Sequence, residues 1–348
     1  MRNRLRWLSF LLLLSLAVGC AGATPPPPTA TPAPTVPPTP TVTPAPTPTP
    51  TPFLVLTDEA GRQVVLRARP QRIVTLAPSA TEMIFAVGAG DRLVGRDALS
   101  DYPPEAQRVP SIGSTYQTLN TEAILALRPD LILAPGVISP EQVKTLEGLG
   151  LVVFHQSTPT DLEGIFQQIL TVGRLTGNVA QAEQVVAALR DRVRAVEEKV
   201  KAAPARPKVF YELDATDPSK PWTAGPGSFI DRLITIAGGR NVGAVLSREW
   251  GQLSLEELIR QDPDVILLGT ANYGETPEKV RQRPGWARLR AVREGRIYPI
   301  NADLVTRPGP RVVEGLETMA RLLHPELFPQ GGREPLRRAL AEALAGVR

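Results

Sequence analysis

The stretch YQTLNTEAILALRPDLIL (residues 116–133) reappears as WGQLSLEELIRQDPDVIL (residues 250–267), at a constant offset of 134 residues and without a gap. Each copy begins with an aromatic residue, continues through a helix N-cap (Asn120 or Ser254) and a glutamate, and ends in Pro-Asp and a buried strand. A solenoid would need several copies of a shorter period. The repeat therefore predicts two related lobes.

Short apolar runs alternate with amphipathic stretches around each copy. We expect strands at 72–76, 131–134, 151–154, 208–213, 264–269 and 296–300. We expect helices at 79–87, 140–149, 161–175, 227–237, 277–282 and 311–323. Ser79 and Glu82 have the spacing of a capping box, which places the start of the first helix at Ser79. This alternation is typical of α/β lobes with mostly parallel sheets.

One uninterrupted helix is predicted between the strands and helices of the first lobe and those of the second. Residues 178–203 contain no Gly or Pro, and their apolar residues recur every three or four positions. Pro204 then ends the helix. The expected fold is therefore α/β, with two Rossmann-like lobes (53–177 and 204–330) joined by one long bridging helix.

The N-terminus has the pattern of an export signal. Residues 1–19 combine three arginines with a short apolar stretch and small residues before Cys20, the only cysteine. This resembles a bacterial lipobox, in which Cys20 is lipidated and becomes the new N-terminus. A plain cleaved signal or an uncleaved anchor are the alternatives, and either exports the chain. Pro and Thr dominate residues 24–52, so 20–52 reads as a lipidated stalk that would span roughly 90 Å over its Pro/Thr-rich part if fully extended.

Composition excludes several kinds of function. The formal charge of +4 includes the three signal arginines, so the mature chain is nearly neutral and nucleic acid is not an expected partner. The lobes contain two histidines and no cysteine, which are too few side chains to build a transition-metal site from His and Cys ligands. No nucleophile-elbow motif or phosphate-binding loop occurs. We therefore expect no cofactor and no enzymatic activity. A basic tail, 331–348, stays unexplained.

Aromatic and polar residues in equivalent loops indicate a ligand cleft. Tyr116 and Trp250 would face each other if ligands bind where parallel strands end. Trp222 lies in a turn-rich loop before a helix, and Asp303 and Arg307 follow the last strand. The alternatives are that each aromatic residue packs under its own loop and that Asp303 and Arg307 only pair to hold theirs.

Glu122 and Glu256 occupy equivalent positions early in the two repeated helices. Each carboxylate could complement the positive end of its helix dipole, worth about 0.3–1 kcal/mol. Alternatively, the pair could dock onto basic residues of a two-fold symmetric partner.

The segments in this order resemble the periplasmic cobalamin- and siderophore-binding proteins of ATP-driven importers. The resemblance runs from about Gln71 to Leu327 and includes RIVTLAPSATE (72–82), SDYPP (100–104) and RPGPR (307–311). It implies two lobes with little hinge motion and an ABC permease dimer that binds the glutamates at 122 and 256. Localisation would be extracytoplasmic, on the outer face of the cell membrane or in a periplasm.

Within that family the sequence is most similar to the cobalamin binders. Their cleft aromatics match Tyr116, Trp222 and Trp250, and their cleft Asp and Arg match Asp303 and Arg307. Two further aromatic positions of that subfamily are Leu99 and Leu304 here. The implied ligand is a corrinoid, with a ferric siderophore or haem as the alternative. A stalked structural protein and a metal-dependent enzyme on the same scaffold are the alternatives of other classes.

Overall fold

The computed structural model describes residues 51–116 and 118–328. The predicted signal 1–19, the lipidation site Cys20, most of the stalk and the basic tail 331–348 lie outside these ranges. The described residues belong to one compact unit. No helix among the residues that the structure describes is long and apolar enough to cross a bilayer.

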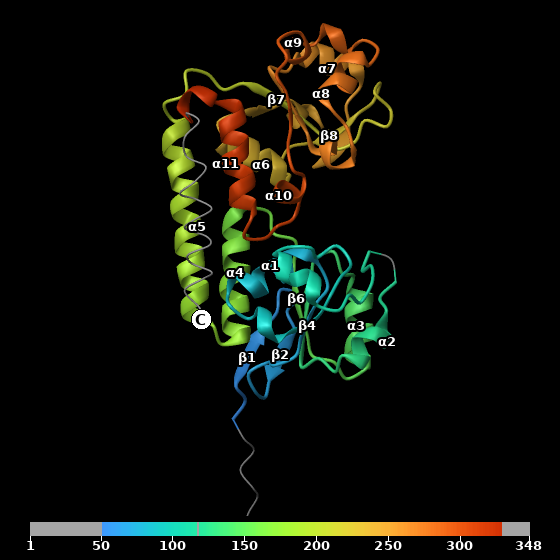
Figure 1. Cartoon of the computed structure of the whole chain (residues 1–348), viewed down its shortest axis with the longest axis vertical. Coiled ribbons are helices and arrows are strands. Elements are labelled where there is room, and N and C mark those ends of the chain that lie inside the picture. Colours follow the sequence, from blue (N-terminus) through green and yellow to red (C-terminus); the bar gives the residue numbers. More distant parts are fainter. Residues whose placement is uncertain (1–50, 117, 329–348) are drawn as a thin grey trace, which may run out of the picture. The chain divides into compact units, whose positions relative to one another are not determined.

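The first lobe is built on a four-stranded, wholly parallel sheet in the order β4-β3-β5-β6 (Figure 1). The strands are β3 (Ile73–Thr75), β4 (Leu93–Arg96), β5 (Leu131–Pro135) and β6 (Val153–Gln156). Helices α1 (Pro78–Ala86), α2 (Thr121–Ala126), α3 (Pro140–Gly148) and α4 (Leu162–Thr176) connect and cover them. A hairpin of β1 (Leu54–Thr57) and β2 (Gln63–Leu66) precedes the sheet.

The second lobe repeats this plan with the parallel order β12-β11-β7-β9. The strands are β7 (Lys208–Glu212), β9 (Arg240–Asn241), β11 (Val265–Leu268) and β12 (Ile297–Pro299). Its helices are α6 (Phe229–Ile236), α7 (Leu255–Gln261), α8 (Pro277–Gln282), α9 (Arg290–Arg293), α10 (Asp303–Thr306) and α11 (Val312–Leu323). A short antiparallel ribbon of β8 (Trp222–Ala224) and β10 (Trp250–Gln252) is added to it. Two parallel sheets and a long helix between them confirm the predicted fold class.

The two repeated segments fold alike in detail. Asp130 accepts hydrogen bonds from the backbone N–H of Arg72 (2.9 Å), and Asp264 accepts one from Lys208 (2.8 Å). Each aspartate thus ties its own strand to the start of the neighbouring parallel strand. Arg128 and Asp262, at equivalent positions, both adopt φ of 46°, where the helix ends and the chain turns into the strand. The predicted N-caps are also confirmed, since the side chains of Asn120 and Ser254 accept from the third helical N–H.

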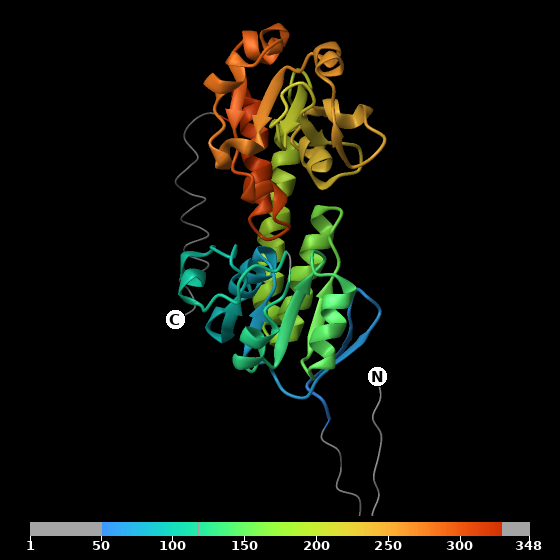
Figure 2. The same cartoon turned by 90° about the vertical axis from the view of Figure 1, so that its right-hand side faces the viewer.

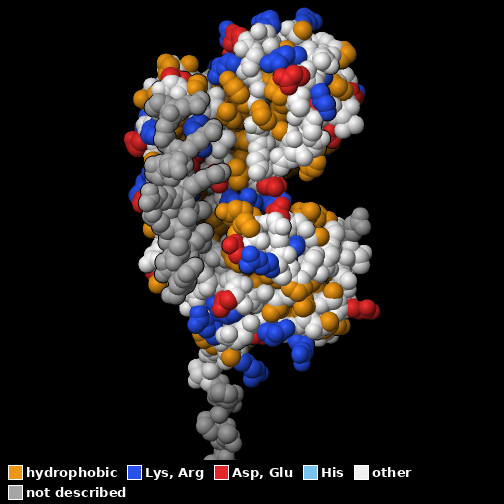
Figure 3. Space-filling view, in the orientation of Figure 1, with side chains coloured by type: hydrophobic (Ala, Val, Ile, Leu, Met, Phe, Trp, Pro, Cys, Tyr) orange, Lys and Arg blue, Asp and Glu red, His pale blue; other side chains and the backbone are white. Residues whose placement is uncertain are grey.

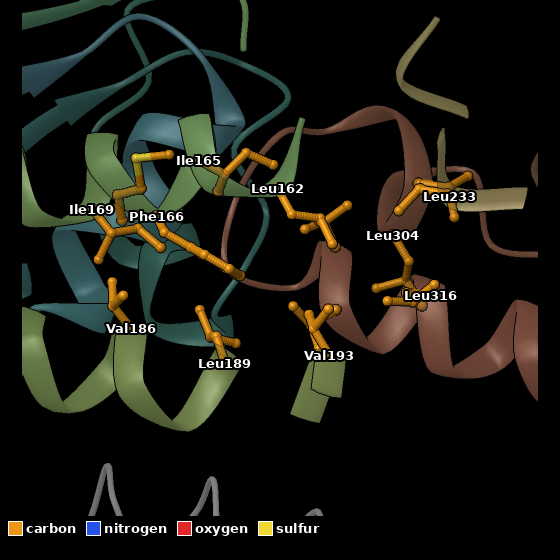
Figure 4. Close-up of a cluster of buried hydrophobic side chains, with 14 of the residues drawn as sticks. Leu162, Ile165, Phe166, Ile169, Val186, Leu189, Val193, Leu233, Leu304 and Leu316 are labelled. Atoms are coloured by element: carbon orange, nitrogen blue, oxygen red, sulfur yellow. The ribbon is translucent and has the colours of Figure 1, made fainter. Parts of the chain in front are cut away.

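The long helix α5 (Val179–Val200) lies against both lobes (Figure 2). The view in Figure 3 is hollowed between the lobes, with apolar side chains along the hollow. The buried face of α5 carries apolar residues at a spacing of three or four, namely Ala182, Val186, Leu189, Val193 and Val196. They belong to one hydrophobic core that continues from α4 to Leu233, Leu304 and Leu316 of the second lobe (Figure 4). A Cβ on Gly173 of α4 would lie 2.4 Å from Ala182 Cβ, so the close approach of the two helices requires glycine there.

Three local predictions were wrong. Helix α1 begins one residue before Ser79, with Ala77 as N-cap and Pro78 as first residue, so Ser79 and Glu82 form no capping box. Proline is favoured at the first helical position because it has no N–H to satisfy. Strand β6 starts at Val153, two residues later than predicted, and the segment around Trp222, which was expected to be a turn-rich loop, contains the strand β8.

Glu82 is instead used in a contact between the lobes. Its carboxylate, 2% exposed, accepts a hydrogen bond of 2.6 Å from Arg311 at the start of α11. The Arg311 guanidinium lies over the Tyr102 ring, 4.0 Å from its centroid. Burial raises the pKa of Glu82, although the hydrogen bond and charge of Arg311 oppose the rise. A second pair, Arg192–Glu317 at 2.9 Å, joins α5 to α11.

Replacing Arg311 by Met should destabilise the fold by about 3–5 kcal/mol at pH 7, because a buried carboxylate is left unpaired. A carboxyl group whose pKa is raised on folding contributes stability at acidic pH and loses it as pH rises through the folded pKa. The cost of Arg311→Met should therefore shrink on acidification. Denaturant titrations of the unit 50–348 at pH 5 and pH 8 measure this. The matched control is Glu82→Gln/Arg311→Met, which should cost less than the single change; equal costs at both pH values would contradict the interpretation.

Candidate functional site

A cleft of about 270 Å³ is lined by both lobes. From the first lobe it takes the segments that follow β3, β5 and β6, together with Tyr116. From the second lobe it takes Trp250, the start of α6, and residues 305–308 beyond β12. The carboxyl ends of parallel strands thus supply most of its walls, as expected for a ligand site in an open α/β sheet.

The structure brings Tyr116 and Trp250, from the equivalent loops of the two lobes, to the same cleft. Both remain accessible, with Tyr116 60% and Trp250 39% exposed, so neither is packed away under its own loop. Trp222, 42% exposed, does not line the cleft. It sits on β8 opposite Gln252, while Trp250 is opposite Ala224, so both tryptophans are on one face of the ribbon. They form an apolar surface that continues from the cleft.

Arg307 lies in the cleft wall between two carboxylates. Its guanidinium is 2.7 Å from Asp101 of the first lobe and 3.0 Å from Asp303. Burial alone would raise the pKa of Asp101, but the hydrogen bond and charge of Arg307 lower the pKa below its usual value. The Asp303–Arg307 ion pair, which the sequence offered as the alternative to ligand contact, is thus present. Asp303 itself does not line the cleft.

The remaining lining groups are uncharged. Of the described residues in the wall, Arg307 alone carries a formal charge; the polar ones are Ser79, Gln156, Ser157, Thr158, Gln168 and Thr306. Hydroxyl and amide groups suit a neutral ligand edge rich in amides. A Cβ on Gly136 would lie 2.4 Å from the Thr158 nitrogen, so glycine lets the loops after β5 and β6 meet closely.

Glu122 and Glu256 are both exposed, each in the first turn of its repeated helix. No ion pair to either carboxylate occurs within residues 51–116 and 118–328. The neighbouring Glu257, by contrast, is held by Arg260 at 2.6 Å. The two free carboxylates are thus available to a partner.

Sequence reasoning missed two contributors to the site. Asp101 was noted only as part of SDYPP (100–104), yet it holds Arg307 from 206 positions away. Phe229 and Ile230 at the start of α6 line the cleft, but in the sequence they read only as core residues of a helix. No local pattern could have indicated either contact, because both depend on how the lobes meet.

Comparison with known proteins is consistent with this geometry. A family model described as "Periplasmic binding protein" matches residues 73–304. A cobalamin-binding protein of Halobacterium salinarum is 34% identical over 279 residues, covering 77% of this chain and 73% of that protein. An uncharacterised ABC transporter substrate-binding lipoprotein of Bacillus subtilis, YvrC, is 30% identical over 284 residues, covering 80% and 88%.

Among solved structures, the periplasmic haem-binding protein RhuT of Roseiflexus sp. RS-1 superimposes with a TM-score of 0.67 at 28% identity. The match covers 74% of this chain and 99% of that one. A shared fold thus extends to proteins described with different ligands. The family match spans both sheets, the bridging helix and all the cleft-lining residues except 305–308, and this chain belongs to the periplasmic binding protein family, as a substrate-binding protein rather than an enzyme.

Proposed function

We propose that this chain is the monomeric substrate-binding lipoprotein of an ABC importer, and that it captures a corrinoid in the cleft between its lobes. The observation that carries the ligand proposal is the pair of accessible aromatic side chains, Tyr116 and Trp250, in a cleft without net positive charge. Flat aromatic faces suit a large macrocycle, and uncharged polar groups suit its amide substituents.

The charge of the cleft disfavours an anionic ferric siderophore. Such a chelate would need cationic groups that are free to meet it. Arg307 is already balanced by Asp101 and Asp303, so this triad has a formal charge of −1. A neutral or cationic ligand meets no comparable electrostatic cost.

A haem ligand would need a protein group on its iron, commonly His or Tyr. His155 precedes the lining residue Gln156 on β6. Because successive strand residues point to opposite faces of the sheet, His155 points away from the side of Gln156 and is not placed to bind haem iron in the cleft. Tyr116 is the lining residue that could serve. A corrinoid holds its metal inside its own macrocycle and needs no such group. The haem-binding relative of similar fold keeps haem as the second candidate.

Capture would require little rearrangement. The common core along α5 and the pairs Glu82–Arg311 and Asp101–Arg307 fix the lobes around the cleft. A site that is already formed loses less free energy to ordering when the ligand binds. The tryptophan surface of Trp222 and Trp250 would cover one face of the macrocycle, while Asp303 and Arg307 would meet polar groups at its edge.

Calorimetric titration of the unit 50–348 with cyanocobalamin tests the ligand. We expect one-to-one binding that weakens about tenfold or more in Trp250→Ala, because an aromatic face is lost. Trp250→Phe is the conservative control and should retain most of the affinity. If cyanocobalamin releases no heat and leaves the thermal midpoint unchanged, the corrinoid proposal is wrong, and hemin and ferric siderophores become the next ligands to titrate.

We further propose that Glu122 and Glu256 dock the loaded protein onto basic residues of the permease dimer. Their equivalent positions, exposure and freedom from ion pairs among the described residues support this role. Exposed charge pairs of this kind determine orientation and association rate more than affinity.

The double change Glu122→Ala/Glu256→Ala should leave cyanocobalamin affinity unchanged and reduce cobalamin uptake at least about tenfold in cells that carry it as their sole copy. Glu183→Ala, which removes an exposed carboxylate from α5, is the matched control and should transport normally. Normal uptake by the double variant would rule out this docking role.

Cys20 is proposed as the lipid-anchor site, supported by its place after the export signal and by the lipoprotein relative YvrC. One acyl chain binds a membrane only marginally, whereas several chains hold a protein there.

Replacing Cys20 by Ser should move the protein from the membrane fraction to the soluble extracytoplasmic fraction, as measured by immunoblot of fractionated cells. Ligand affinity of the released protein should be unchanged. Retention of the variant in membranes would indicate an uncleaved signal anchor instead.

A further inference from the structure

Tyr273 is the most exposed large hydrophobic side chain among the described residues, at 86%. It ends the short 3-10 helix Gly269–Tyr273, which directly follows β11, an inner strand of the second sheet. Tyr273 therefore lies at the carboxyl edge of that sheet. Residues 305–308, which line the cleft, follow the neighbouring strand β12 at the same edge.

The loop that carries Tyr273 is held directly against the cleft loop. Asn272 donates a hydrogen bond from Nδ2 to Oδ1 of Asn301, at 3.1 Å. The same Asn301 oxygen accepts from the backbone N–H of Asp303, at 3.0 Å. One side-chain amide thus connects the Tyr273 loop to the segment that positions Asp303 and Arg307.

Buried charges fix the other end of this loop. Glu212, fully buried at the end of β7, accepts a hydrogen bond from Thr270 at 2.7 Å. Arg283 donates to Glu212 at 2.5 Å and also to Glu275, two residues after Tyr273, at 2.9 Å. Charge-assisted hydrogen bonds of this kind are stronger than neutral ones. Tyr273 is therefore an exposed aromatic residue on a loop that is anchored at both ends, so its ring can meet a ligand without the cost of first ordering the loop.

The size of the cleft leaves a role for such a group. Its volume of about 270 Å³ is below the range of roughly 300–1,000 Å³ that holds drug-sized ligands. A corrinoid is larger than these, so part of the macrocycle must project from the cleft. The projecting part would lie beside the loops at the carboxyl edge of the second sheet.

We propose that Tyr273 is an additional ligand-contacting residue, which forms the outer wall of the site by stacking on the part of the macrocycle that projects from the cleft. This inference rests on the proposed corrinoid-binding function. Stacking uses the ring face and not the phenol oxygen, which gives Tyr273→Ala and Tyr273→Phe different expected effects.

Cyanocobalamin titrations of four variants beside the wild type test the inference, all on the unit 50–348. Tyr273→Ala should bind about five- to tenfold more weakly, while Tyr273→Phe should bind like the wild type. Asn272→Ala, which frees the loop from Asn301, should weaken binding to a smaller extent. Phe53→Ala is the matched control, because Phe53 is an exposed aromatic residue (41%) beside the end of α4, away from the cleft.

Wild-type affinity in Tyr273→Ala would overturn the role of Tyr273 and leave the corrinoid proposal in place. Failure of the wild type itself to bind cyanocobalamin would overturn the corrinoid proposal and this inference with it. A loss in Tyr273→Phe as large as in Tyr273→Ala would contradict stacking and indicate a hydrogen bond from the phenol. Since the Tyr273 side chain is exposed, neither Tyr273→Ala nor Tyr273→Phe should alter the thermal midpoint of the ligand-free protein.

Discussion

The packing of α5 against α4 and α11 is the interaction on which the rest of the structure depends. Each lobe has its own parallel sheet, but the apolar stripe of α5 belongs to a core that reaches both sheets. At about 25 cal/mol per Å² of buried apolar surface, such a stripe is the main favourable contribution at the junction. The pairs Arg192–Glu317 and Glu82–Arg311 then specify how the lobes are oriented. The geometry of the cleft follows from that orientation.

The two lobes share a plan but do not contribute equally to the site. The repeat gives each lobe an N-capped helix with an exposed glutamate in its first turn, and a residue of positive φ after that helix. It also gives each lobe an aspartate whose side chain accepts a hydrogen bond from the start of the neighbouring strand. The second lobe alone adds the β8–β10 ribbon with its two tryptophans. The first lobe contributes Tyr116 together with small apolar and uncharged polar residues, most of them at the ends of its strands. A duplicated scaffold thus carries an asymmetric site, as expected for a ligand with different faces.

Much of the fold could be predicted because its signals are local. The alternation of elements, the N-caps Asn120 and Ser254, and the long helix all follow from periodicity and capping chemistry. The capping box at Ser79 failed because Pro78 offers a competing helix start. The β8 strand has only three residues, too few for a detectable alternation of polar and apolar side chains. Its partner strand β10 begins 28 residues later, so no short turn marks the pair as a hairpin. The Asp101–Arg307 contact could not be predicted, since it joins residues 206 positions apart and depends on how the two lobes meet.

The described chain passes from one lobe to the other once, through α5. Every strand of the first sheet therefore lies before residue 157, and every strand of the second lies after residue 207. Each sheet is therefore completed by strand pairings within its own lobe, such as Ile73 with Leu131 and Val209 with Val265. A chain threaded through a membrane from its N-terminus can complete its first sheet before the second emerges. The apolar face of α5 also emerges before the second lobe, which packs against that face in the finished structure.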